Sequence, residues 1–141
     1  MTVLGLTGYA QSGKDTVGQI LVKERGYTRL SFADNVREAI WRLNPIVQKT
    51  QHFGKQTLRE LVEHYGGEGA KNGIPEVRRL LQVMGTEVGR EMFGQNAWIE
   101  MARRQAAAVE GSVVFTDVRF GNEAEFIRSI GGTVVQVTRS G

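Results

Sequence analysis

A short apolar run that ends in a glycine-rich turn is the feature that most limits what this chain can fold into. Residues 3–7 are mostly apolar, which is typical of a buried strand. They lead into Gly8-Tyr-Ala-Gln-Ser-Gly-Lys14, which follows the pattern G-x-x-x-x-G-K. Such a turn curls its backbone N–H groups inward around an anion, and the helix that follows adds the positive end of its dipole. We therefore expect a phosphate-binding loop whose contacts come from Gly8, Gln11, Ser12, Gly13 and Lys14.

Position 15 departs from the usual pattern for such loops. Ser or Thr normally follows the lysine and binds Mg²⁺, whereas this chain has Asp15 followed by Thr16. Asp15 could hold Mg²⁺ through a water molecule, or it could only favour the helix N-terminus. Thr16 could donate its hydroxyl to a phosphate. The metal therefore has to depend in part on groups outside the loop.

Strand and helix patterns alternate along the rest of the chain. Strands are predicted over residues 3–7, 28–32, 112–116 and 133–138, and helices over 14–25, 34–43, 55–65, from 75 onward, 96–109 and 122–130. Residues 66–73 hold four glycines and are predicted to form a mobile loop. The order favours an α/β layer fold around a parallel sheet, in a single domain with a helical substrate-binding insertion at about 34–110.

Composition limits the class of partner. The chain has 141 residues, a formal charge of +3 and no cysteine, which fits one domain in a reducing compartment such as the cytoplasm. Thirteen of its 18 basic residues are arginines, and they suit small phosphate-bearing ligands because the guanidinium fork binds phosphate oxygens in pairs. We expect no nucleic-acid partner because there is no long basic run, and no membrane partner because no apolar run reaches the length of a span.

Two carboxylates follow predicted strands. Asp117 ends the third strand, where it could lie near Mg²⁺ through water, and Arg119 could reach a phosphoryl group. Asp34 follows the second strand and could accept a proton from the attacking oxygen or orient it, with Arg37 one turn further on. The alternative for Asp34 is an N-cap of a helix that begins near residue 36, and for Asp117 a turn residue or cap.

A third group of polar residues lies around the long helix predicted after residue 75. Arg78 and Gln82 are four residues apart and share a helix face, so an arginine for a monophosphate and an amide for a base edge would act together. A solvated polar face is the simpler interpretation. Trp98 could stack on a base, although aromatic residues at helical spacing are more often part of a core. The two histidines, His52 and His64, are interpreted as surface residues.

Five blocks together resemble the phage-type deoxynucleoside monophosphate kinases. The resemblance spans nearly the whole chain, in order, and rests on the loop from Gly8 to Thr16 with Gly-Lys-Asp-Thr, Ser-Phe-Ala-Asp (31–34), Arg-Arg-Leu-Leu-Gln-Val-Met-Gly-Thr-Glu-Val-Gly-Arg (78–90), Trp98 and Asp-Val-Arg-Phe-Gly-Asn-Glu (117–123). Many enzymes share the first block, whereas 78–90 and 117–123 are far more specific.

The resemblance implies a three-layer α/β/α P-loop kinase fold and transfer of the ATP γ-phosphoryl group to a deoxynucleoside monophosphate, with Mg²⁺. If the chain is of phage origin, it would act in the cytoplasm of the host cell. It implies that Lys14 stabilises the transferring group and that Asp117 and Arg119 lie beside the metal and phosphates. The monophosphate site would comprise Asp34, Arg37, Arg78, Gln82 and Arg90. The resemblance does not fix the oligomeric state and permits a homodimer.

The resemblance also implies a fifth strand and an arginine-bearing lid after the fourth strand. Here the sequence ends at residue 141, just past Arg139, so we expect a missing or shortened lid, with Arg139 on the nucleotide side. Two other readings stay open. One is a different small-molecule kinase, similar to dephospho-coenzyme A kinase or phosphomevalonate kinase, and the other is a nucleotide-binding module without transferase activity.

Overall fold

The computed structural model describes residues 2–9 and 11–139. The chain forms two compact units: unit 1 comprises Met1–Asp34 and Asn96–Gly141, and unit 2 comprises Asn35–Gln95. No helix in the described part of the chain is both long and apolar enough to cross a membrane.

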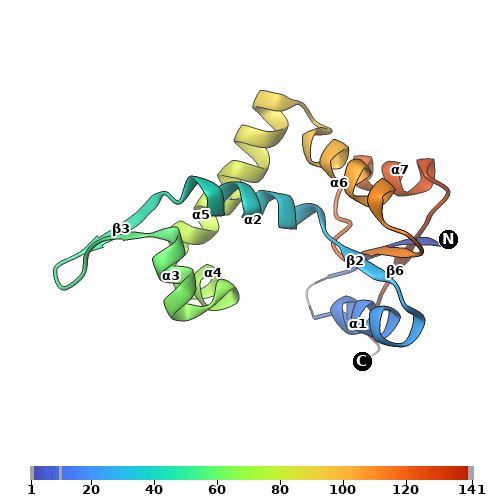
Figure 1. Ribbon diagram of the computed structural model, residues 1–141, viewed down its shortest axis with the longest axis horizontal. Helices are drawn as coiled ribbons and strands as arrows, with labels where there is room; N and C mark the ends of the chain where they lie inside the picture. Colours follow the sequence, from blue (N-terminus) through green and yellow to red (C-terminus); the bar gives the residue numbers. More distant parts are fainter. Residues whose placement is uncertain (1, 10, 140–141) are drawn as a thin grey trace. The chain divides into compact units, whose positions relative to one another are not determined.

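Unit 1 is built on a four-stranded sheet. Its strands are β1 (Val3–Thr7), β2 (Thr28–Leu30), β5 (Val113–Phe115) and β6 (Thr133–Gln136). They run parallel in the order β2-β5-β1-β6, with Gly5 beside Phe115 on one side of β1 and beside Val134 on the other. Figure 1 shows α1 (Lys14–Arg25) on one face of this sheet and α6 (Ala97–Ala108) and α7 (Gly121–Ser129) on the other. The predicted three-layer α/β/α architecture with a parallel sheet is confirmed.

Side chains that alternate along β1 determine which helix covers which face. A Cβ atom on Gly18 of α1 would lie 2.8 Å from Thr116 Cγ2 and 3.9 Å from Leu6 Cδ1, so α1 lies very close to that face. A Cβ on Gly5 would instead meet Val118 and Ile127, on the α7 side. The main core lies on this second face and comprises Val3, Phe32, Ile99, Ala102, Ala106, Val113, Phe115, Val118, Phe126 and Ile127.

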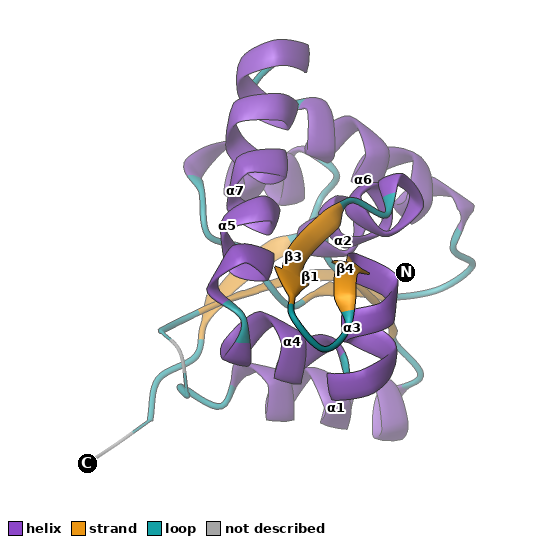
Figure 2. Cartoon of the chain, turned by 90° about the vertical axis from the view of Figure 1, so that its left-hand side faces the viewer, coloured by secondary structure: helices purple, strands orange, loops and turns teal. Residues whose placement is uncertain are grey.

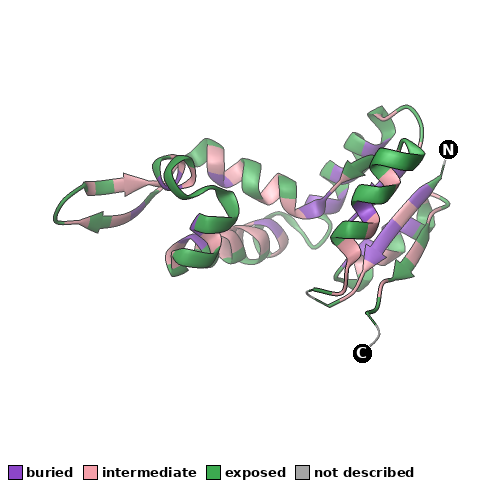
Figure 3. Ribbon diagram, turned by 90° about the horizontal axis from the view of Figure 1, so that it is seen from below, coloured by how far each residue is buried: buried purple, intermediate pink, exposed green. Residues whose placement is uncertain are grey.

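Unit 2 contains most of α2 (Phe32–Leu43), a hairpin of β3 (Ile46–Thr50) and β4 (Gly54–Thr57), three helices α3 (Leu58–Tyr65), α4 (Gly67–Gly73) and α5 (Pro75–Val83), and a π-helix η1 (Met84–Phe93). Figure 2 shows the two antiparallel strands of the hairpin next to each other. Most of the hairpin is exposed or half-buried, whereas buried residues gather along the sheet of unit 1 and the inner sides of the helices (Figure 3). The core of unit 2 comprises Ile40, Val47, Leu58, Leu61, Ala70 and Val77.

Unit 2 differs from the sequence prediction in three places. Residues 54–57 form a strand rather than the start of a helix, because they pair with β3, and the helix begins only at Leu58 after the Thr57 cap. Residues 66–73 are not a mobile loop: α4 forms there because Ala70, which is 0% exposed, packs into the core of unit 2. The α-helix predicted from residue 75 onward ends at Val83. From Met84 the chain continues as a π-helix, whose residues no longer repeat at the α-helical spacing.

Candidate active site

The turn between β1 and α1 has the backbone geometry of a phosphate-binding loop. Ser12 N donates to the carbonyl oxygen of Tyr9 at 3.1 Å, and Gly13 has φ = 97°, which a residue with a side chain adopts only under strain. Gln11 is also left-handed, with φ = 64°. Lys14 Nζ lies 3.4 Å from the Gly8 carbonyl oxygen, so the side chain folds back over the turn. The expected helix 14–25 is confirmed, but Ala10, within the loop, is outside the described residues.

Gly8 is held tightly against the end of β6. Val137 N donates to the carbonyl oxygen of Thr7 at 2.8 Å, which extends the ladder past β6. A Cβ on Gly8 would lie 2.6 Å from Val137 O and 2.7 Å from Ser12 Oγ, so only glycine fits without movement of the backbone. Arg139 follows two residues later and is exposed. Its assignment to the nucleotide stays a prediction.

Two polar features of this loop could bind an anion: the Ser12 hydroxyl and the start of α1. Ser12 Oγ is buried and has no hydrogen-bond partner among residues 2–9 and 11–139. The N-cap residue of α1 is Gly13, so no side chain caps the first amide groups of that helix. A buried hydroxyl without a partner costs free energy that a phosphate oxygen would recover. Loop, hydroxyl and helix terminus therefore fit a phosphate group.

Asp15 and Thr16 both lie in the first turn of α1 and are exposed. That position suits the helix dipole, and it also leaves the carboxylate open to water-mediated contact with a metal. The described residues contain no group of three or more His, Cys, Asp or Glu side chains that could hold a metal ion. Magnesium in phosphoryl-transfer sites commonly takes one or two carboxylates and completes its shell with phosphates and water, so such a group is not required.

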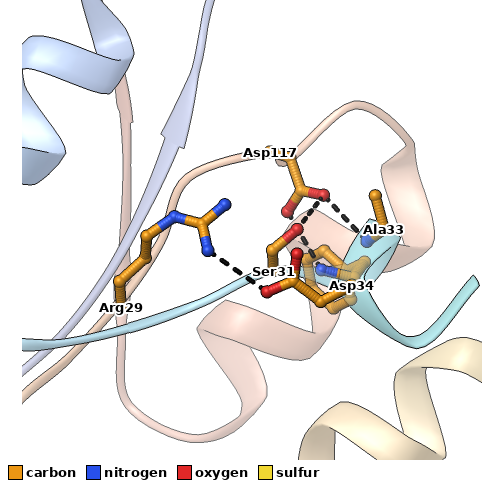
Figure 4. Close-up of polar contacts among 6 residues, drawn as sticks. Arg29, Ser31, Ala33, Asp34 and Asp117 are labelled. Atoms are coloured by element: carbon orange, nitrogen blue, oxygen red, sulfur yellow. Dashed lines mark hydrogen bonds and ion pairs between the residues drawn. The ribbon is translucent and has the colours of Figure 1, made fainter. Parts of the chain in front are cut away.

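The carboxylate of Asp117 caps α2 (Figure 4). Its Oδ2 accepts from Ser31 Oγ at 2.8 Å and from Ala33 N at 2.9 Å, and its Oδ1 accepts from Phe32 N at 3.0 Å. The two amide groups are the first of α2, which the helix itself cannot satisfy, and the hydroxyl belongs to the residue before the helix. The structure thus uses Asp117 as a cap of a helix distant in sequence, and its role at a metal stays a prediction.

Asp34 does not cap a helix that begins near residue 36. The helix begins at Phe32 and the preceding strand ends at Leu30, because Asp117 supplies the cap and releases Asp34 into the first turn. There Asp34 Oδ2 forms an ion pair with Arg29 Nη1 at 3.1 Å, with both side chains 47% exposed (Figure 4). The carboxylate of Asp34 is therefore half-exposed and paired with an arginine, and its contact with a substrate stays a prediction.

Arg119 is anchored by a residue to which the sequence assigned no role. Glu123 is only 5% exposed, and its Oε1 accepts from Arg119 N at 2.9 Å and from Phe120 N at 3.0 Å. The Glu123 carboxylate therefore fixes the turn that carries Arg119, whose own side chain is exposed. The sequence signal for such a cap is a glutamate in the first turn of a helix, three residues after the residue that precedes the helix.

The topology brings the loop and Asp117 to the same edge of the sheet. From β1 the chain crosses through α1 to β2, and from β5 it crosses through α7 in the opposite direction to β6. In parallel sheets ligands bind outside the carboxyl ends of the strands where the crossovers diverge in this way. Val118 N donates to Leu6 O at 3.1 Å, so the chain after β5 still runs beside the end of β1.

The remaining predicted site residues lie on other helices. Arg37 is exposed on α2, and Arg78 and Gln82 are exposed on α5, which confirms their shared helix; Arg90 lies on η1. Next to Arg78, Arg79 pairs with Glu76, and the hydrogen bond from Arg79 lowers the pKa of that carboxyl. Trp98 is 8% exposed on α6, as a core residue is, and its contact with a base stays a prediction. His52 and His64 are surface residues, as expected.

The family model and the curated relatives point to one family. A family model described as deoxynucleotide monophosphate kinase matches residues 70–141, which include the blocks at 78–90 and 117–123. A putative deoxynucleotide monophosphate kinase of Acanthamoeba polyphaga mimivirus is 28% identical over 153 residues, covering 100% of this chain and 76% of that protein.

Two phage proteins match over shorter stretches. The deoxynucleoside-5'-monophosphate kinase of Escherichia phage T5 is 32% identical over 71 residues, and the deoxynucleotide monophosphate kinase of Escherichia phage RB69 is 32% identical over 90 residues. These alignments cover 50% and 61% of this chain but only 28% and 34% of the phage proteins. Among solved structures, a shikimate kinase from Bacteroides thetaiotaomicron aligns with 96% of this chain and 56% of its own, at 19% identity and a TM-score of 0.41.

Proposed function

The chain belongs to the deoxynucleotide monophosphate kinase family, and we propose that it transfers the γ-phosphoryl group of ATP to a deoxynucleoside monophosphate. The observation that carries the proposal is the loop after β1, where the buried Ser12 hydroxyl has no hydrogen-bond partner in the described chain and no side chain caps the start of α1. The mimivirus relative, which covers the loop as well, supports the same activity.

The donor side would use the loop residues for the triphosphate. Backbone N–H groups from Gly8, Gln11 and Gly13 and the Ser12 hydroxyl would contact phosphate oxygens, because the loop is curled by left-handed residues and the buried Ser12 hydroxyl has no partner in the described chain. Lys14 would supply positive charge to the β- and γ-phosphates, where charge changes most during transfer. Thr16 and Arg139 would add a hydroxyl and a guanidinium at the margin of this site.

The metal would be held mainly by the phosphates and by Asp15. Magnesium, when bound, supplies neutralisation of phosphate charge. Asp15 is exposed in the first turn of α1 and could reach such an ion through water. Asp117 is less suited to direct contact, because three donors already occupy its carboxylate.

The acceptor side would use residues of the other helices. Asp34 would orient the attacking phosphate oxygen or accept a proton from it, and Arg119 would stabilise the transferring group. Arg37, Arg78 and Arg90 would bind the monophosphate, since arginine presents paired donors to phosphate oxygens. Gln82 and Trp98 would contact the base. Because phosphoryl transfer asks little covalent chemistry of the protein, these residues would act through position and charge.

A coupled kinase assay tests the proposal. The chain is given ATP, Mg²⁺ and each of the four common deoxynucleoside monophosphates, and formation of the diphosphate is followed. We expect turnover with at least one acceptor and a loss of about a hundredfold or more in Lys14→Ala. Arg78→Ala should raise the KM for the acceptor, whereas Arg79→Ala is the matched control because Arg79 already pairs with Glu76.

Other outcomes would assign a different function. ATP binding in calorimetry together with turnover of none of the acceptors, and no binding of any monophosphate, would favour a nucleotide-binding module. Turnover of ATP with another small phosphate acceptor, such as dephospho-coenzyme A, would favour a different kinase of the same architecture. A KM for the monophosphate that stays unchanged in Arg78→Ala would remove Arg78 from the acceptor site without touching the family assignment.

A further inference from the structure

Resting on the proposed kinase activity, we propose that Asp117 and Ser31 form a positioning pair that caps α2 and thereby holds Asp34 in place, and that Asp117 does not bind magnesium directly. The pair joins the end of β5 to the start of α2 across 86 residues of sequence. It concerns how the acceptor carboxylate is placed and not which substrate is bound.

The Asp117 carboxylate binds the first two amide groups of α2. Asp117 accepts three hydrogen bonds of 2.8 to 3.0 Å, two from backbone amides in the first turn of α2 and one from the Ser31 hydroxyl. Ser31 is 3% exposed, so its hydroxyl needs this partner. A negative charge at a helix N-terminus also interacts favourably with the helix dipole. The two groups therefore satisfy each other and the helix at the same time.

Ring contacts and a backbone hydrogen bond of Phe32 hold the segment between the cap and Asp34. The ring of Phe32 stacks on Phe115 with centroids 4.9 Å apart and meets Phe126 edge-on at 6.2 Å. Phe115 lies two residues before Asp117, so Phe32 is fixed to β5 through both its ring and its amide. Asp34 follows Phe32 within the same helical turn, and its direction is set by that anchored backbone.

Hydrogen bonds occupy three of the roughly four acceptor positions on the Asp117 carboxylate. Oδ2 accepts from both Ser31 Oγ and Ala33 N, which uses both of its lone-pair directions. A metal ion at Oδ2 would displace one of these donors and uncap the helix. A carboxylate with most of its acceptor positions in a cap is expected to act on catalysis through the position of Asp34, and any contact with magnesium would pass through water, as predicted from its place after a strand.

Two variants of the full chain separate these roles. Ser31→Ala removes one donor and leaves the carboxylate in place, and Asp117→Asn puts an amide N–H₂ or a single oxygen where three donors converge. We expect kcat to fall about threefold to tenfold in Ser31→Ala and about tenfold to a hundredfold in Asp117→Asn, since misplacing a catalytic group is costly. The double variant should match Asp117→Asn, because both changes break one unit.

The Mg²⁺ concentration for half-maximal rate should stay within about twofold in all three. Ser129→Ala, which removes a hydroxyl bonded to Phe126 O on α7, is the control and should leave kcat unchanged.

A readout without substrates keeps the test decisive. Amide hydrogen exchange at Phe32 and Ala33 should become about threefold to thirtyfold faster in both variants, as loss of an N-cap predicts. A tenfold or larger rise in the half-saturating Mg²⁺ concentration in Asp117→Asn, with Ser31→Ala unaffected, would overturn the proposal in favour of a metal ligand. Unchanged exchange in both variants would also overturn it. If Asp117→Asn does not fold, Ser31→Ala decides by its kcat and exchange rates. If the wild-type chain transfers no phosphoryl group, the kinase proposal fails while the exchange rates still decide the cap.

Discussion

Arg59 Nε donates a hydrogen bond to the carbonyl oxygen of Trp41 at 2.8 Å, and its guanidinium lies over the indole ring of the same residue, 5.4 Å from the ring centroid. Its Nη2 also reaches the carbonyl oxygen of Arg42 at 3.4 Å, and its backbone N donates to Asn44 Oδ1 at 3.0 Å. The Arg59 guanidinium thus donates to the last carbonyl groups of α2, where the helix dipole favours positive charge.

Arg59→Ala should destabilise unit 2. The change removes two hydrogen bonds to helix carbonyls and a cation–π contact at a half-buried site, so we expect the free energy of unfolding to fall by about 2 kcal/mol. Urea denaturation followed by circular dichroism measures it. Arg59→Lys should recover only part of the loss, because an ammonium group cannot reproduce the planar stack.

Arg42→Ala is the matched control for Arg59. Arg42 forms an exposed ion pair with Glu38, with side chains 79% and 57% exposed. Exposed pairs of this kind contribute about 0 to 0.5 kcal/mol. Equal losses of stability in the two alanine variants would contradict a capping role for Arg59.

Alanine in place of glycine should stabilise α4. Gly67 and Gly73 lie in this helix, and a Cβ on either would meet nothing within 4 Å. Both residues lie at ends of the helix, so helix propensity predicts a gain of about 0.5 kcal/mol or less for each change to alanine. Thermal unfolding measures the gain. In Gly111→Ala the sign should reverse, because Gly111 has φ = 102°. No gain from Gly67→Ala would mean that the segment behaves as a loop.

The sequence was informative where one pattern had one cause. The run before Gly8, the helix after Lys14 and the strand before Asp117 each appear in the structure within two residues of the prediction. The segment rich in glycine at 66–73 was assigned wrongly, because composition outweighed the single buried contact of Ala70. The hairpin at 46–57 was missed, since its strands gain their stability from pairing with each other and not from an apolar alternation.

The site was predictable in its residues and not in its contacts. A sequence places Asp117 after a strand and Asp34 before a helix, but the cap joins groups that are 84 to 86 residues apart. No local pattern encodes which of two aspartates caps the helix, because the choice depends on how β2 and β5 pair. Glu123 is the opposite case, since its three-residue offset from Phe120 is a local signal that was open to detection.

Gly8→Ala should disrupt nucleotide binding. The new Cβ would lie 2.6 Å from Val137 O. The amide of Val137 donates a hydrogen bond to Thr7 O, so a shift of this backbone away from the Cβ would weaken that bond. We expect ATP affinity to fall at least about tenfold and stability to fall by about 1 to 3 kcal/mol. Calorimetric titration with ATP and Mg²⁺ checks the affinity, and Gly73→Ala serves as a glycine control outside the loop. Unchanged affinity in Gly8→Ala would show that the loop tolerates a shift of the β6 end.

Ser12→Ala should separate stability from binding. In the structure the Ser12 hydroxyl is buried without a hydrogen-bond partner in residues 2–9 and 11–139, so its removal relieves a desolvation cost of about 1 kcal/mol and should leave the free protein equally or more stable. ATP should bind more weakly, by about threefold to thirtyfold, because the phosphate loses the donor that the free protein holds ready. Thermal unfolding with and without ATP and Mg²⁺ measures both effects in one series: the variant should unfold at the same or a higher temperature alone, and gain less from the nucleotide. Ser129→Ala, whose hydroxyl is already bonded to Phe126 O, should show the nucleotide-dependent gain of the wild type. A Ser12→Ala variant that loses stability alone and keeps its full gain from ATP would assign the hydroxyl to the fold of the loop and not to the phosphate.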